Sequence, residues 1–155
     1  MKLSIWKAGP EADPILRALF ARYLDVMAEW FEFEAATAYD DAHIWATGNH
    51  VYLASLDGTP IGFALTGPAP KWAAVLEVHE FFVLPEFHRQ GAGQQLAAFV
   101  WSQHPGDWLV RVLTANTGAV AFWESAISRS SGGTFRADDQ QVDGRTWRFF
   151  RFYAS

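Results

Sequence analysis

The 155-residue sequence contains no cysteine. Disulfides, thiolate metal sites and a cysteine nucleophile are therefore excluded, and the composition fits a reducing compartment, so we expect a cytoplasmic protein. Lysine and arginine, 12 in all, are outnumbered by 17 aspartates and glutamates, which gives a formal net charge of -5. This balance argues against general nucleic-acid binding, because that binding depends on neutralising phosphates with cationic side chains.

The sequence also has no long apolar run. No stretch of about 18 apolar residues occurs, and Met1 to Lys7 lacks the apolar core of a signal peptide, so we expect no membrane partner. The 5 histidines have no ligand spacing such as His-x-x-x-His, so we predict no metal site. A Gly-x-Ser-x-Gly elbow is missing as well, which together with the missing cysteine disfavours acyl-enzyme chemistry.

Hydrophobic residues make up 50% of the chain, and 16% of all residues are aromatic. With this length and composition we expect one globular domain over residues 1–155. Apolar patterns predict strands at 3–6, 51–56, 60–66, 74–84, 108–114, 134–137 and 145–153. They predict helices from Pro14 to about residue 30, over 37–45, over 94–103, and from an Asn116-Thr117 cap to about residue 127.

The segment from Phe81 to Leu96 is the most informative part of the chain. A hydrophobic strand ends at Pro85, and a polar loop with Gly91 and Gly93 then opens an amphipathic helix. A glycine-rich helix N-terminus favours phosphate, because its first amides lack helical partners and the helix dipole is positive there. A dinucleotide fingerprint would require a third glycine where Leu96 stands. The loop alone therefore leaves two interpretations open, a phosphate site and an ordinary tight turn.

Two motifs in a fixed order extend this interpretation. The first is His88-Arg89-Gln90-Gly91-Ala92-Gly93, which follows Val83-Leu84-Pro85, and the second is Asn116-Thr117-Gly118-Ala119-Val120-Ala121-Phe122-Trp123. Together with the element order, they resemble the GNAT superfamily of N-acetyltransferases. The resemblance implies an α/β (α+β) fold with a mixed, largely antiparallel central sheet of about six or seven strands and about four helices. Its fourth and fifth strands would splay apart to form a cleft.

The resemblance also implies acetyl-CoA as cosubstrate and a direct, ternary-complex transfer to an amine. Backbone groups of Phe81, Phe82 and Val83 would pair with the pantetheine arm, as an added strand does. The pyrophosphate would lie on the loop formed by His88, Arg89, Gln90, Gly91, Ala92, Gly93 and Gln94. Asn116 would bind the pantetheine arm, beside Phe122 and Trp123.

Two positions depart from the family's pattern. His88 stands where the family usually has arginine or glutamine, and Trp123 stands where many relatives carry a tyrosine that protonates the departing thiolate. An indole N–H cannot act as an acid near neutral pH. The second departure keeps an alternative open, namely a non-catalytic acyl-CoA-binding or regulatory module.

Transfer to an amine needs a base, because the attacking nitrogen must be neutral. Glu77 and Glu80, on the strand before the loop, are the candidates. We favour Glu80, which lies nearer to Val83 and the expected acetyl position. The alternative for each residue is a solvent-facing carboxylate or one paired with an arginine.

The acceptor we expect is a small-molecule amine on an apolar body. Aromatic residues interleaved with acids would form its binding wall, namely Trp30, Phe31 and Phe33. The same aromatic residues are equally consistent with core packing or with a homodimer surface. Arg145, Arg148 and Arg151 could instead favour an acceptor with a carboxylate, or form the solvent face of an edge hairpin. A peptide or protein acceptor is a further alternative.

Overall fold

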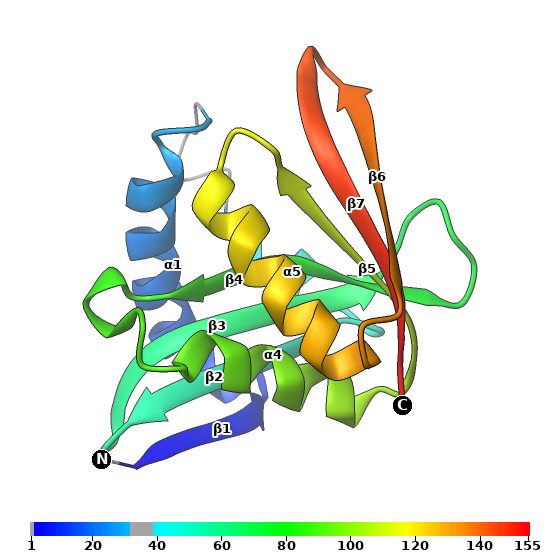
Figure 1. Ribbon diagram of the computed structural model, residues 1–155. Helices are drawn as coiled ribbons and strands as arrows, with labels where there is room; N and C mark the ends of the chain where they lie inside the picture. The colour runs from blue at the N-terminus through cyan, green and yellow to red at the C-terminus, as the bar shows by residue number, and fades with distance from the viewer. Residues whose placement is uncertain (1, 32–38) are drawn as a thin grey trace. The chain divides into compact units, whose positions relative to one another are not determined.

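The computed structural model describes residues 2–31 and 39–155 (Figure 1). The strands are β1 (Leu3–Ala8), β2 (His50–Leu56), β3 (Thr59–Pro68), β4 (Val75–Val83), β5 (Gly106–Leu113), β6 (Phe135–Val142) and β7 (Arg145–Ala154). The described helices are α1 (Asp13–Met27), α3 (Asp41–Ile44), α4 (Ala92–Gln103) and α5 (Thr117–Ser131), with 3-10 turns η1 (Pro10–Ala12) and η2 (Pro85–Phe87). This element order confirms the one predicted from the sequence.

The seven strands form one mixed sheet in the order β1-β2-β3-β4-β5-β7-β6. The pairs β1–β2, β5–β7 and β6–β7 are antiparallel. In contrast, β4 and β5 run parallel, and their ladder extends over three residue pairs from Val75–Asp107 to Glu77–Leu109. The predicted mixed, largely antiparallel sheet is therefore confirmed.

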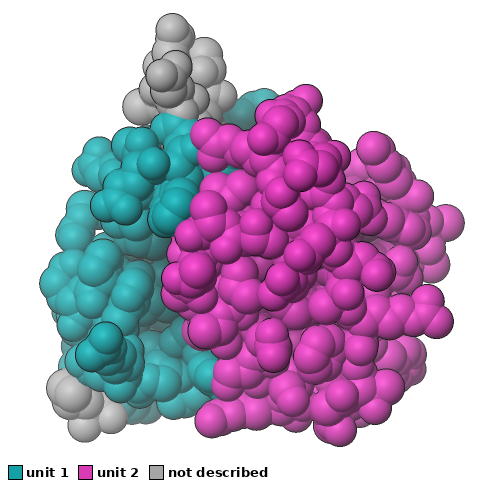
Figure 2. Space-filling view, turned by 45° about the horizontal axis from the view of Figure 1, so that its top comes forward, with its two compact units in different colours: residues 1–65, 80–96 teal, residues 66–79, 97–155 magenta. Residues whose placement is uncertain are grey.

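Contacts along the chain define two compact units, Met1–Leu65 with Glu80–Leu96, and Thr66–His79 with Ala97–Ser155 (Figure 2). In the first unit, α1 packs on the sheet through residues that include Leu16, Phe20 and Tyr23, against Phe63 and Phe82. Ring centroids of Phe20 and Phe63 are 5.6 Å apart. This apolar stripe is what holds α1 against the end of β4.

The second unit has two differently covered sheet faces. On one face α5 packs against β5, β6 and β7 (Figure 1), and Trp101 of α4 contacts Phe152 with ring centroids 4.8 Å apart. On the other face a smaller apolar cluster contains Leu109 and Phe149, with Trp72 packed against it. Cross-strand neighbours share a face, so the side chains of β5 and β7 divide between these two surroundings.

Boundaries differ from the predicted ones by a few residues at several elements, and most at β6. The sequence pattern predicts a strand that ends near Ala137, whereas β6 continues to Val142 through a polar run that includes Asp138 and Gln141. Register with the apolar β7 extends it, because a paired strand does not need high intrinsic propensity. Helix α4 begins at Ala92, two residues before the predicted start.

Candidate functional site

The end of β4 has one backbone edge paired and the other edge turned away from β3. The Leu84 N–H donates to the Ile61 carbonyl of β3 at 2.8 Å. Because successive residues of a strand direct their N–H and C=O groups to opposite edges, Phe82 also faces β3, and Phe81 and Val83 face the other way. The edge formed by Phe81 and Val83 is the one that the sequence interpretation requires for an extended ligand.

Gly62 of β3 permits the close approach of these strands. A Cβ at this position would lie 2.5 Å from the Phe82 carbonyl oxygen and 3.2 Å from the Val83 Cα. Real Cβ atoms do not approach so closely, and the neighbours here are backbone atoms that cannot turn aside. Glycine inside a strand commonly marks such an approach.

His88 closes the turn that follows β4. Its Nε2 lies 2.7 Å from the carbonyl oxygen of Val83. The Pro85–Phe87 turn lies between them, and the salt bridge of Glu86 with Arg22 of α1, 2.8 Å long, ties that turn to the helix. His88, the first residue of the loop, is thus attached to the strand edge described above. The comparison of its residue type with the family's usual arginine or glutamine did not suggest this structural role.

The loop continues with two left-handed residues, Arg89 at φ 67° and Gly91 at φ 78°. Left-handed backbone in a turn gathers consecutive N–H groups into a concave arrangement that suits an anion. Helix α4 follows at once, and its hydrogen-bond ladder starts with the Gln95 N–H on the Gly91 carbonyl at 3.0 Å. The amides of Ala92 and Gly93 precede this bond and lie outside the helical ladder.

Asn116 caps α5, as predicted. Its Oδ1 accepts from the Ala119 N–H at 3.1 Å. Among the described residues the Asn116 side chain makes no other hydrogen bond, so its Nδ2 group remains able to donate to a ligand. Further along α5, Phe122 is half-buried and Trp123 is 8% exposed, with the Trp123 ring centroid 6.2 Å from that of Trp101.

Glu80 is half-buried on β4 and accepts a hydrogen bond from the Tyr23 hydroxyl of α1. Burial raises the pKa of Tyr23 far above its usual value, and the neighbouring charge of Glu80 and the hydrogen bond to it act in the same direction. Tyr23 therefore stays protonated and acts as the donor to the carboxylate. No sequence signal marked Tyr23, because its spacing reads as ordinary helix core.

Glu77 has a different environment. It is 2% exposed, and its Oε2 accepts from the Arg111 Nε at 2.6 Å. Arg111 also lies over the Phe149 ring, 5.9 Å from its centroid. The pairing with an arginine, which was one of the sequence alternatives, therefore describes Glu77. A carboxylate this buried and bound to a guanidinium is poorly placed to accept a proton from a ligand.

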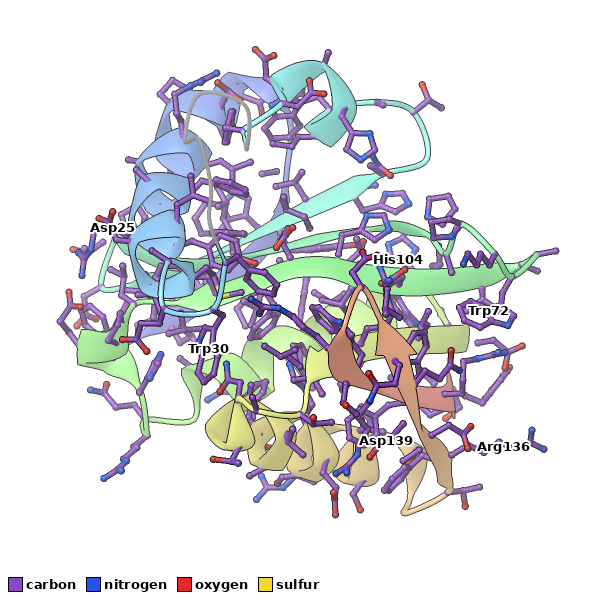
Figure 3. The ribbon with its side chains drawn as sticks, turned by 90° about the horizontal axis from the view of Figure 1, so that it is seen from above. Asp25, Trp30, Trp72, His104, Arg136 and Asp139 are labelled. Carbon is purple, nitrogen blue, oxygen red and sulfur yellow. The ribbon has the colours of Figure 1, made fainter. Side chains whose placement is uncertain are left out.

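The remaining predicted residues lie at the end of α1 or outside the described chain. Trp30 and Phe31 are both half-buried, and both donate their N–H groups to Met27, at 2.9 and 3.0 Å (Trp30 is labelled in Figure 3). Phe33 lies outside the described residues.

Over residues 2–31 and 39–155, no three histidine, aspartate or glutamate side chains are grouped so that they could hold a metal ion. In the same ranges no helix combines the length and the apolar character that crossing a bilayer requires.

The model of the acetyltransferase (GNAT) family matches residues 20–127. The chain is similar to the solved ribosomal-protein-S18-alanine N-acetyltransferase of Escherichia coli, with 17% identity, a TM-score of 0.67, and coverage of 99% of this chain and 95% of that chain. It is also similar to the PaiA N-acetyltransferase of Thermoplasma acidophilum in complex with coenzyme A, with 15% identity, a TM-score of 0.71 and 99% coverage of both chains.

A third solved structure, an acetyltransferase from Thermus thermophilus, has 15% identity, a TM-score of 0.70, and coverage of 99% of this chain and 97% of that chain. At such identities the similarity concerns the fold. No curated protein sequence matches the chain.

Proposed function

The chain belongs to the GNAT acetyltransferase family, and on this basis we propose that it transfers the acetyl group of acetyl-CoA to a primary amine of a small molecule. The observation that supports this most strongly is the segment from Val83 to Gln95. There a strand edge, a turn held by His88 and two left-handed residues lead into the N-terminus of α4. Such a backbone fits the pyrophosphate of a coenzyme. Acetyl-CoA, when bound, supplies the activated thioester.

For the coenzyme we propose the following contacts. The backbone N–H groups of the loop would hold the pyrophosphate, over Arg89, Gln90, Gly91, Ala92, Gly93 and Gln94. The backbone edge of Phe81 and Val83 would pair with the pantetheine arm, while Phe82 anchors the strand in the core. The Asn116 Nδ2 would donate to the same arm, because its Oδ1 caps α5.

We propose Glu80 as the base. An amine acceptor binds as an ammonium ion, and its nitrogen can attack only after losing a proton. Glu80 is half-buried and held as a carboxylate acceptor by Tyr23, whereas Glu77 is almost fully buried on Arg111. The ammonium group first passes one proton to Glu80. The neutral nitrogen then forms the new N–C bond as the C–S bond breaks, its second proton goes to water, and water returns a proton to the departing thiolate. The indole of Trp123 cannot supply that proton.

The acceptor would contact Trp30 and Phe31, at the end of α1. Half-buried aromatic side chains suit an amine attached to an apolar body, through ring contacts and cation–π attraction. Phe33, predicted for the same wall, lies outside the described residues. That the whole chain works as one domain, forms a homodimer and resides in the cytoplasm remain predictions.

Calorimetry with acetyl-CoA, followed by thiol release with a panel of small amines and peptides, tests the proposal. We expect coenzyme binding and amine-dependent thiol release, with Glu80→Gln lowering kcat by about 10²-fold or more. Glu77→Gln serves as the matched carboxylate variant. Binding without acceptor-dependent thiol release would favour the non-catalytic alternative, and release with peptides alone would favour a protein acceptor. If both variants kept the turnover and its pH profile, the base assignment would be wrong.

A further inference from the structure

Arg151 of β7 is a half-buried arginine that lies over an aromatic ring. Its Cζ lies 5.5 Å from the centroid of the Trp72 ring. Its Nε atom is buried and has no hydrogen-bond partner. Over the described ranges no carboxylate lies within 4.0 Å of its guanidinium nitrogens. The stacking on Trp72 offsets part of the desolvation of the charge, but it leaves the N–H donors of the guanidinium unused.

The strand register places a second cation beside Arg151. Arg136 of β6 is the residue directly opposite Arg151 in the antiparallel ladder, and it is exposed (labelled in Figure 3). Directly opposed residues project from the same face, where like charges destabilise the pair. Two opposed guanidinium groups without a carboxylate between them are a common way to bind an anion.

Arg148, on the same strand, provides the contrast. Its direct partner across the ladder is Asp139, and the two form hydrogen bonds of 2.8 and 3.1 Å. The Asp139 carboxylate holds the pKa of Arg148 above its usual value through the hydrogen bond. On this face, therefore, the hairpin supplies an acid to its arginine. On the face of Arg151, the residue directly opposite on β6 is an arginine, Arg136, instead of an acid.

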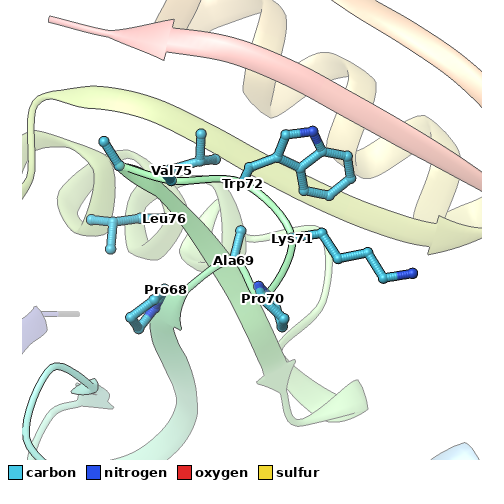
Figure 4. A pocket seen from close by; sticks show the side chains of 9 residues that line it. Pro68, Ala69, Pro70, Lys71, Trp72, Val75 and Leu76 are labelled. Carbon is cyan, nitrogen blue, oxygen red and sulfur yellow. The ribbon is translucent and has the colours of Figure 1, made fainter.

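The surroundings of Arg151 are apolar on one side. Leu109 lies opposite it on β5, and Phe149 lies two residues away on β7, with Trp72 and Phe149 rings 6.1 Å apart. Trp72 lies in the connection between β3 and β4, residues 69–74. This connection and the adjoining strand ends line a hollow, and Lys71 extends from the same side of the connection (Figure 4). Three acids share the sheet face, Glu77 opposite Leu109, Asp107 opposite Tyr153 and Asp138 opposite Phe149. Glu77 is ion-paired with Arg111, and over the described ranges none of the three lies within ion-pair distance of Arg151.

We propose that Arg151 and Arg136 bind the carboxylate of a small organic acid whose apolar body rests against Trp72. A carboxylate accepts two parallel N–H bonds from a guanidinium, and this planar geometry matches arginine better than lysine. The aromatic and aliphatic neighbours favour an acid with a ring or alkyl body over a bare inorganic anion. The proposal concerns binding at the β6–β7 hairpin and does not require acetyl transfer.

Side-chain Nε–H resonances of arginine, recorded by ¹H–¹⁵N NMR during titration with benzoate, test the site in the full chain. Arg151→Lys identifies the Arg151 resonance. We expect a saturable shift of that resonance in the wild-type protein. Calorimetry with benzoate, which does not depend on the Arg151 resonance, is expected to give an affinity at least tenfold lower in Arg151→Gln, several-fold lower in Arg136→Gln, and unchanged in Arg148→Gln. The Arg148 variant is matched, because it removes the same charge from the same strand on the opposite face.

Benzyl alcohol and inorganic phosphate serve as the neutral and the inorganic probes. We expect neither to shift the Arg151 resonance at concentrations where benzoate saturates it. An unmoved resonance with benzoate would overturn the proposal, and so would an equal loss of affinity in Arg148→Gln, which would indicate bulk electrostatics. Equal binding of phosphate would overturn the assigned ligand class. Thermal melting confirms that each variant is folded. If Arg151→Gln unfolds, Arg151→Lys takes its place in the test. Lysine keeps the charge but not the planar pair of donors, so calorimetry is expected to show weaker binding than in the wild-type protein.

Discussion

The Tyr23 hydroxyl donates a hydrogen bond to the carboxylate of Glu80, which lies 57 residues further along the chain. Tyr23 is buried in an aromatic cluster with Phe20, Phe63 and Phe82, so its hydroxyl has a fixed position. A donor held in this way stabilises the ionised form of the carboxylate and lowers its proton affinity. It also fixes the direction of the carboxylate. The proposed base thus depends on a residue of α1 that has no direct part in the transfer.

Replacing Tyr23 with phenylalanine removes that donor and keeps the ring. A hydrogen bond to a charged group is worth about 1.5–3 kcal/mol, and its loss destabilises the ionised carboxylate, so we expect the pKa of Glu80 to rise. The acidic limb of the kcat/KM profile would then move to higher pH, with the activity below that limb reduced about tenfold. Tyr39→Phe is the matched control, because Tyr39 donates to Asp13 at 2.5 Å instead. An unshifted limb in Tyr23→Phe would contradict the role of Tyr23.

Replacing His88 with alanine removes its contact with the Val83 carbonyl. One hydrogen bond contributes about 1 kcal/mol, so we expect acetyl-CoA to bind about fivefold more weakly, as measured by calorimetry. His79→Ala is the control, since the Nε2 of His79 also contacts a carbonyl, that of Pro68 at 3.1 Å. Equal affinity losses in both variants would mean that the turn at His88 has no special part in binding.

Replacing Gly62 with alanine places a methyl group against the Phe82 carbonyl. Overpacking against backbone costs about 1–3 kcal/mol, so we expect a lower free energy of unfolding and weaker coenzyme binding through the shifted strand end. Gly118→Ala is the opposite case. Its nearest neighbour would be the Asn116 Oδ1 at 4.0 Å, and alanine in a helix is favoured over glycine by about 0.5–1 kcal/mol. Urea unfolding of both variants measures the difference, and equal stability changes would contradict the close approach at Gly62.

Asp13 makes the stability dependent on pH. Hydrogen bonds from Trp45 Nε1 at 2.8 Å and from the Tyr39 hydroxyl at 2.5 Å hold the pKa of Asp13 below the usual value of an aspartate. A depressed pKa in the folded state contributes stability above the unfolded pKa, and this contribution is lost as the pH falls through the folded value. The stability advantage of the wild-type protein over Asp13→Asn should therefore shrink below about pH 4. Thermal melting from pH 7 to pH 2 measures it, and a constant difference would contradict the assignment.

Much of the fold could be predicted because local signals and periodicity agreed. The Asp57-Gly58 turn and the Asn116 cap are local features, and both lie where the sequence pattern put them. The length of β6 could not be predicted, because a polar run such as Asp138 to Gln141 forms a strand only through its pairing with β7. The exposure of Ile15 and Val26, 38% for each residue, is likewise set by which stripe of α1 meets the sheet.

The candidate site divides in the same way. The loop and the Asn116 motif are contiguous in sequence, so their residue types carry the signal. The distinction between Glu77 and Glu80 depends on partners far along the chain, Arg111 and Tyr23, which a strand pattern cannot indicate. Gly62 did have a signal, since a glycine flanked by apolar strand residues often marks close backbone contact.

The presence of an indole at position 123, where it packs against Trp101, has a consequence for the proposed reaction at high pH. A tyrosine that acted as the acid would make the rate fall at high pH as its phenol ionises, near pH 10 for an unperturbed tyrosine side chain. An indole does not ionise in this range. With solvent as the proton source for the departing thiolate, the rate should level off on the alkaline side rather than fall, up to the pH at which the protein unfolds.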